Sequence, residues 1–140
     1  MKQHFIDAGA FVAQSVPTDQ YHDQAVAIAK TLKEGKSFGI TTDFVLSEVF
    51  TFLRRKVGYP AGIKFYEAVK ASEDITIIYT GQKTFEQAIA TLARYHDKEF
   101  SFTDCVSFTV MEERHLTYAF TFDKHFSQAG FELVRAMWYV

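Results

Sequence analysis

Short apolar runs alternate along this chain with longer segments whose apolar residues recur at helical spacing. In residues 19–34, for example, Ala25, Ile28, Ala29 and Leu32 fall on one face, which predicts a helix that ends near Gly35. Similar patterns predict helices over residues 42–57, 60–71, 84–95 and 101–115. The short runs predict strands over residues 4–6, 37–41, 75–79, 118–122 and 131–134. Strands and helices that alternate in this way predict an α/β fold with a parallel sheet covered on both faces.

The length of the chain, 140 residues, is that of one domain, and we expect a single domain over residues 1–140. Hydrophobic residues make up 48% and charged residues 23%, which argues against disorder. Fifteen Phe and seven Tyr predict an aromatic core, with an apolar surface for a partner as the minor alternative. The net charge of −2 gives no general attraction to nucleic acid, so a polyanionic substrate would require a local basic patch or a bound metal.

The single cysteine, Cys105, excludes an internal disulfide and fits a reducing compartment. The apolar run at the N-terminus is too short for a signal peptide, and no stretch approaches 18 uninterrupted apolar residues. We therefore expect a cytoplasmic protein that does not enter the membrane.

Four acidic residues stand at the ends of apolar strands or within apolar helix segments: Asp7, Glu48, Asp104 and Asp123. An unpaired carboxylate in apolar surroundings is costly, so such groups usually have a cation, a hydrogen-bond network or a raised pKa. The ligands of open parallel sheets collect at the carboxyl ends of the strands. Because Asp7 and Asp123 follow predicted strands and Glu48 and Asp104 lie near helix starts, we expect all four to meet at that edge around one shared cation.

Three of these acids also have a simpler interpretation as helix caps. Asp7 and Asp123 each precede a helical segment or turn, and Asp104 completes the Ser-x-x-Asp pattern of a capping box that begins at Ser101. Glu48 has no such interpretation as a cap, because it lies in the middle of its predicted helix, on the same side as Phe44 four residues earlier. The argument for a common site therefore depends on the four acids together.

The sequence around these acids resembles the PIN-domain ribonucleases, and within them the VapC-type toxins of VapBC toxin–antitoxin pairs. The resemblance is carried by Phe-Ile-Asp-Ala-Gly-Ala-Phe at residues 5–11, Thr-Thr followed by an apolar helix with Glu48, Phe-Thr-Asp-Cys-Val-Ser at residues 102–107, and Thr-Phe-Asp-Lys-His-Phe at residues 121–126. It covers essentially the whole chain in order and spacing. Cys105 departs from the pattern, since the family often has Ala there.

The resemblance implies a three-layer α/β/α domain with a central parallel sheet of about five strands. It also implies an endoribonuclease whose catalytic residues are Asp7, Glu48, Asp104 and Asp123, and whose products carry a 5′-phosphate and a 3′-hydroxyl. An RNA substrate, a cognate antitoxin and a homodimer are the expected partners.

Oxygen ligands favour Mg²⁺ or Mn²⁺, which we expect to be held by Asp7, Asp104 and Asp123. Zinc is disfavoured because the histidines, at positions 4, 22, 96, 115 and 125, are scattered and there is one cysteine.

Three alternatives remain open at this level. The first is an RNA-processing nuclease outside a toxin pair. The second is a metal-free interaction module that retains the fold, and the third is a phosphoacceptor domain of the receiver type. The receiver class requires adjacent acids after the first strand, whereas Asp7 is followed by Ala8 and Gly9. The basic run at residues 54–56 is a candidate for phosphate contact, although a solvated helix end explains it as well.

Overall fold

The computed structural model describes residues 1–136 of the chain, and residues 137–140 lie outside this description. Within it, strands and helices alternate as the sequence predicts. The strands are β1 (Gln3–Ile6), β2 (Phe38–Thr42), β3 (Ile75–Ile78), β4 (Tyr118–Phe120) and β5 (Glu132–Leu133). The helices are α1 (Ala8–Ser15), α2 (His22–Glu34), α3 (Asp43–Lys56), α4 (Tyr59–Ala71), α5 (Gln82–Arg94), α6 (Phe102–Glu113) and α7 (Lys124–Gln128).

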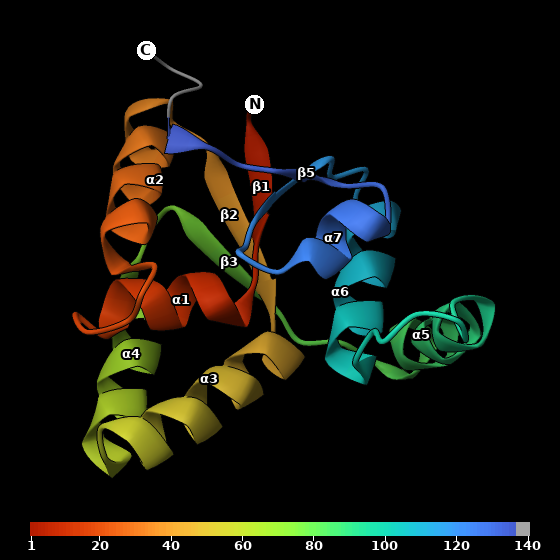
Figure 1. Cartoon of the computed structure of the whole chain (residues 1–140), viewed down its shortest axis with the longest axis horizontal. Coiled ribbons are helices and arrows are strands. Elements are labelled where there is room, and N and C mark those ends of the chain that lie inside the picture. The colour runs from red at the N-terminus through yellow and green to blue at the C-terminus, as the bar shows by residue number, and fades with distance from the viewer. Residues whose placement is uncertain (137–140) are drawn as a thin grey trace.

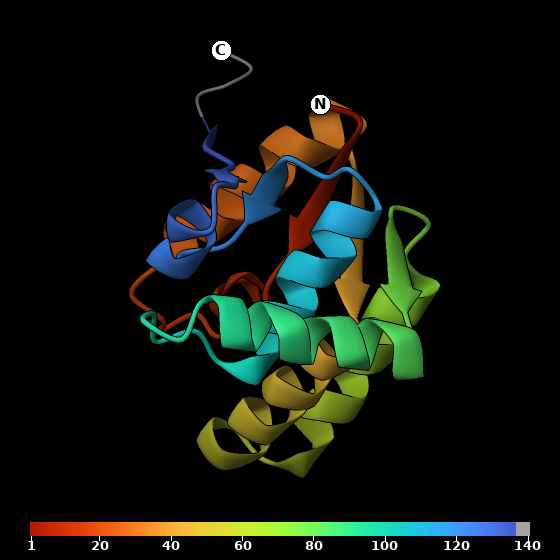
Figure 2. The same ribbon diagram turned by 90° about the vertical axis from the view of Figure 1, so that its right-hand side faces the viewer.

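The five strands form one parallel sheet in the order β3-β2-β1-β4-β5. Figure 1 shows α1, α2 and α4 on one side of this sheet and α5, α6 and α7 on the other, with α3 below the strand ends. In the perpendicular view, α5 and α6 lie in front of the strands (Figure 2). The predicted three-layer α/β/α fold with a parallel sheet of about five strands is confirmed.

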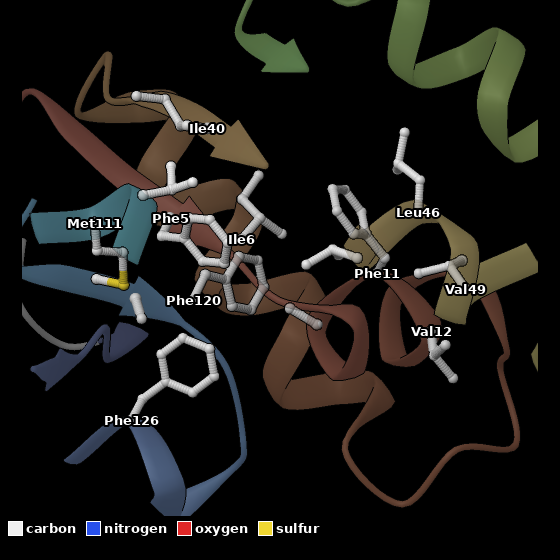
Figure 3. Packing of buried hydrophobic residues seen from close by; sticks show 14 of the residues in the cluster. Phe5, Ile6, Phe11, Val12, Ile40, Leu46, Val49, Met111, Phe120 and Phe126 are labelled. Carbon is white, nitrogen blue, oxygen red and sulfur yellow. The ribbon is translucent and has the colours of Figure 1, made fainter. Parts of the chain in front are cut away.

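The core lies on both faces of the sheet, because successive side chains of a strand point to opposite sides. On β1, Phe5 is fully buried and lies near Met111 of α6 and Phe126 of α7 (Figure 3). Its neighbour Ile6 lies on the other face with Phe11 of α1. The sequence prediction of an aromatic core is confirmed by this packing.

Several element boundaries differ from the sequence prediction. The helix expected over residues 19–34 begins at His22, because residues 17–21 form turns in which the Tyr21 N–H donates to the Asp19 carboxylate over 2.8 Å. The helical segment or turn expected after Asp123 is the helix α7, which Asp123 caps. The strand expected over residues 118–122 ends at Phe120, where the chain leaves the ladder.

The carboxyl ends of β1, β2 and β4 all lead to the same edge of the sheet. The register pairs Ile6 with Phe120, and the Asp7 N–H donates to the Phe120 carbonyl over 3.1 Å. At the end of β2, the Thr42 hydroxyl accepts the Val45 N–H and caps α3. These connections place the segments that carry Asp7, Glu48 and Asp123 side by side. Among residues 1–136, no helix has the length and apolar character needed to cross a membrane.

Candidate active site

A hollow of about 580 Å³ lies at the carboxyl edge of the sheet, and all four acids identified in the sequence line it. Asp7 comes from the end of β1, Glu48 from α3, Asp104 from the first turn of α6 and Asp123 from the segment between β4 and α7. The expectation that these distant residues converge at one edge therefore agrees with their position in the structure.

Asp7 is buried, with 7% of its surface exposed, and its carboxylate does not cap α1. Instead its Oδ2 accepts a hydrogen bond from the Thr121 hydroxyl over 3.0 Å. Burial raises the pKa of Asp7 from 3.8 to about 7, and the negative charges of Asp104 and Glu48 add to this increase. The metal-free protein therefore holds a carboxylate that is costly to ionise, and a cation at the hollow would remove that cost.

Asp104 and Asp123 both act as helix caps, as the simpler interpretation of the sequence proposes. Oδ2 of Asp104 accepts the Ser101 N–H over 3.1 Å, while the Ser101 hydroxyl accepts the Asp104 N–H, which completes a capping box. Oδ1 of Asp123 accepts the N–H of His125 over 2.8 Å. Capping and convergence are compatible here, because each cap also fixes its carboxylate at the edge of the hollow.

His125 belongs to this site although sequence reasoning counted it among the scattered histidines. Its Nδ1 is hydrogen-bonded to Oδ2 of Asp104 at 2.9 Å and lies 3.3 Å from Oδ2 of Asp123. The imidazole also packs edge-on against the buried Phe100 ring, with 5.3 Å between the ring centres. The available signal was its position two residues after Asp123, because an aspartate that caps a helix accepts a backbone N–H from the first helical turn.

Glu48 is exposed at the mouth of the hollow, whereas the sequence placed it within an apolar helix face. Val45 and Val49 point into the core, but Phe52 is 40% exposed, so the apolar stripe does not enclose the glutamate. Desolvation of its carboxyl group raises the pKa of Glu48, and the nearby charges of Asp104 and Asp123 raise it further. Glu48 is therefore electrostatically coupled to the other acids without being buried.

The donor atoms of this site suit a hard divalent cation. Within the described part of the chain, Asp104, Asp123 and His125 offer ligand atoms that lie within 4.8 Å of one another, and Asp7 lines the same hollow outside this compact group. Among residues 1–136, no Lys or Arg side chain lines the hollow. Carboxylate-rich sets of this kind suit Mg²⁺ or Mn²⁺ better than zinc.

Comparison with known proteins agrees with this fold. The PIN domain family matches residues 5–132. The chain is 33% identical over 132 residues to the 23S rRNA-specific endonuclease VapC20 of Mycobacterium tuberculosis, an alignment that covers 94% of this chain and 97% of the relative. It is 36% identical over 124 residues to a VapC ribonuclease of Archaeoglobus fulgidus, which covers 87% of this chain and 78% of that protein.

Solved structures show the same fold. The crystal structure of M. tuberculosis VapC20, described as a Sarcin-Ricin loop cleaving toxin, superposes with a TM-score of 0.83 at 32% identity, covering 94% of this chain and 98% of that one. The VapBC2 structure from Rickettsia felis gives a TM-score of 0.69 at 10% identity and covers 94% of this chain and 96% of that one, which shows the fold alone.

The chain belongs to the PIN-domain family, and its fold is the three-layer α/β/α fold with a parallel sheet that is seen in VapC structures. Within that family its relatives are ribonucleases of the VapC type, so the resemblance drawn from the four sequence motifs is confirmed. The receiver-type alternative is excluded by the same matches.

Proposed function

We propose that this chain is a Mg²⁺- or Mn²⁺-dependent endoribonuclease and the toxin component of a VapBC-type toxin–antitoxin pair. The observation that carries the proposal is the meeting of Asp7, Glu48, Asp104 and Asp123, from four separate segments, around one hollow that contains no Lys or Arg among the described residues. A metal-free interaction module would have no physical need for a buried carboxylate whose pKa is raised to about 7.

In this proposal Asp7, Asp104 and Asp123 hold the metal ion, and Glu48 orients a water molecule at the mouth. The bound ion supplies Lewis acidity, which activates a water molecule and stabilises negative charge on the phosphate oxygens. The Thr121 hydroxyl keeps the Asp7 carboxylate directed into the hollow through its 3.0 Å hydrogen bond. His125 keeps Asp104 and Asp123 close together, because its Nδ1 lies between their Oδ2 atoms.

Substrate and partners follow from the relatives and belong to the proposal. The M. tuberculosis relative is named a 23S rRNA-specific endonuclease, so large-subunit ribosomal RNA is the first substrate to test. We expect products with a 5′-phosphate and a 3′-hydroxyl. A cognate antitoxin and a homodimer are the proposed protein partners, and a small antitoxin gene beside the coding sequence would distinguish a toxin from an RNA-processing nuclease.

The test uses Asp7→Asn and Asp104→Asn in a cleavage assay with Mg²⁺ or Mn²⁺ and with EDTA as the metal-free condition. Both substitutions remove a carboxylate charge while they keep an oxygen acceptor, so we expect cleavage to fall by at least about 100-fold with the fold intact by circular dichroism. Asp97→Asn, at an exposed position outside the hollow, is the matched control and should cleave as the wild type does. Full activity in a folded Asp7→Asn protein would refute the proposal.

A further inference from the structure

Two aromatic rings at the edge of the acidic hollow are stacked face to face. Tyr21, from the segment between α1 and α2, and Phe122, from the segment after β4, have ring centres 4.6 Å apart and planes inclined by 3°. Both side chains line the hollow that contains the four carboxylates. Tyr21 is 36% exposed, so part of this stacked pair is accessible from solvent.

The segments that hold the two rings are the same ones that build the acidic site. Phe122 stands between Thr121, which donates its hydroxyl hydrogen bond to Asp7, and Asp123, which caps α7. On the other side, Asp19 accepts the Tyr21 N–H over 2.8 Å, and the Tyr21 carbonyl accepts the Ala25 N–H over 2.8 Å at the start of α2. The stacked pair is therefore fixed in position relative to the carboxylates.

The negative charge of the hollow favours an uncharged means of holding RNA. Besides the four acids of the site, Asp19 and Glu99 also line it, while no Lys or Arg does so within residues 1–136. Phosphates near this surface are repelled except where a metal ion compensates. Stacking of a nucleobase on an aromatic ring does not depend on net charge and is a main source of affinity for unpaired nucleotides.

A further aromatic ring borders the same hollow from a different element. Phe52, on α3 one turn after Glu48, is 40% exposed and belongs to the lining. Because ligand pockets are lined largely by apolar and aromatic side chains, this position is consistent with the same interpretation. The acidic hollow is thus bordered by accessible aromatic surface from α3 and from the Tyr21–Phe122 pair.

We propose that the Tyr21–Phe122 pair is a stacking platform that holds a nucleobase of the substrate next to the scissile phosphate. This inference rests on the proposed function, since it names a substrate-binding surface of the same site. A paired base within a duplex has no free face to place on Tyr21, whereas a base in a loop or single strand does. Tyr21 is here a substrate-binding residue, and the carboxylates do the chemistry.

The test measures kcat and KM for cleavage of a single-stranded RNA by the full-length protein with Mn²⁺. Tyr21→Ala should raise KM by roughly 10- to 100-fold with kcat changed by less than about threefold, because the stacking surface is lost while the carboxylates remain. Tyr21→Phe should restore the wild-type KM, since it keeps the flat ring. If Tyr21→Ala unfolds, Tyr21→Leu replaces it in the assay. Leucine keeps apolar contact with Phe122 but has no flat ring, so KM should again rise. Tyr59→Ala, at a 66% exposed tyrosine outside the hollow, is the matched control.

A binding measurement separates this inference from the proposed function. In the Asp7→Asn background, an RNA that carries 2-aminopurine should lose fluorescence on binding through stacking, and the additional Tyr21→Ala change should abolish that loss. If the wild type cleaves RNA but Tyr21→Ala keeps both KM and quenching, the stacking platform is refuted and the nuclease stands. If quenching depends on Tyr21 but the wild type does not cleave, the platform is supported and the nuclease proposal fails.

Discussion

Replacing Asp7 with asparagine is expected to stabilise the metal-free protein at pH 8, although the same change should abolish cleavage. The folded protein holds this carboxyl group with 7% exposure, and burial raises its pKa from 3.8 to about 7. Because the pKa is higher in the folded than in the unfolded chain, the contribution of Asp7 favours folding below about pH 3.8. That contribution is lost as the pH rises through 7.

The magnitude follows from the difference between the two pKa values. A shift of this size, at 1.36 kcal/mol per pKa unit, corresponds to roughly 4 kcal/mol of stability lost by pH 8. Asparagine carries no charge and keeps an oxygen that accepts the Thr121 hydroxyl, but its amide group also needs a partner. We therefore expect Asp7→Asn to increase the free energy of unfolding at pH 8 by about 2–4 kcal/mol.

The assay is urea denaturation of the wild type and of Asp7→Asn at pH 8 in EDTA, followed by circular dichroism. Asp97→Asn, which removes an exposed carboxylate, should change stability by less than about 0.5 kcal/mol. Addition of Mn²⁺ should then stabilise the wild type, because a bound cation compensates the buried charge, and should have much less effect on Asp7→Asn.

Two outcomes would refute this reasoning. If Asp7→Asn is less stable than the wild type at pH 8 in EDTA, the carboxylate is already compensated and the metal-free site carries no electrostatic cost. If Mn²⁺ stabilises both proteins equally, the ion binds elsewhere and Asp7 is not among its ligands.

Two further predictions concern the core. Burial lowers the pKa of His4 from 6.5 to about 4, so its contribution to stability is present above pH 6.5 and is lost, by roughly 3 kcal/mol, as the pH falls to about 4. Urea denaturation of Asp7→Asn between pH 6.5 and 4 should show this loss of stability, because the titration of Asp7 would otherwise oppose it. The additional change His4→Gln should make the loss smaller. Phe126→Ala should cost about 3–5 kcal/mol, because Phe126 is fully buried against Phe108 with 5.0 Å between ring centres. The same truncation at Phe38, which is 51% exposed, should cost less than about 1 kcal/mol in the same assay, and similar costs for the two would contradict the packing.

The sequence by itself determined the order of the elements and the edge at which the site lies. Alternating apolar runs and helical periodicities are local features, so they predicted the parallel sheet and both helical layers without tertiary information. Local capping chemistry was also readable, since Ser101 and Asp104 form the predicted capping box. Because the carboxyl ends of parallel strands share one edge, the position of Asp7 and Asp123 after two strands indicated a common site.

Contacts between distant segments were decided by the tertiary structure alone. The hydrogen bond from Thr121 to Asp7 joins residues at opposite ends of the chain, and no periodicity encodes it. The contact of His125 with Asp104 likewise depends on how α7 packs beside α6, so the sequence showed only an isolated histidine. The raised pKa of Asp7 has the same origin, because desolvation depends on what surrounds a group in three dimensions.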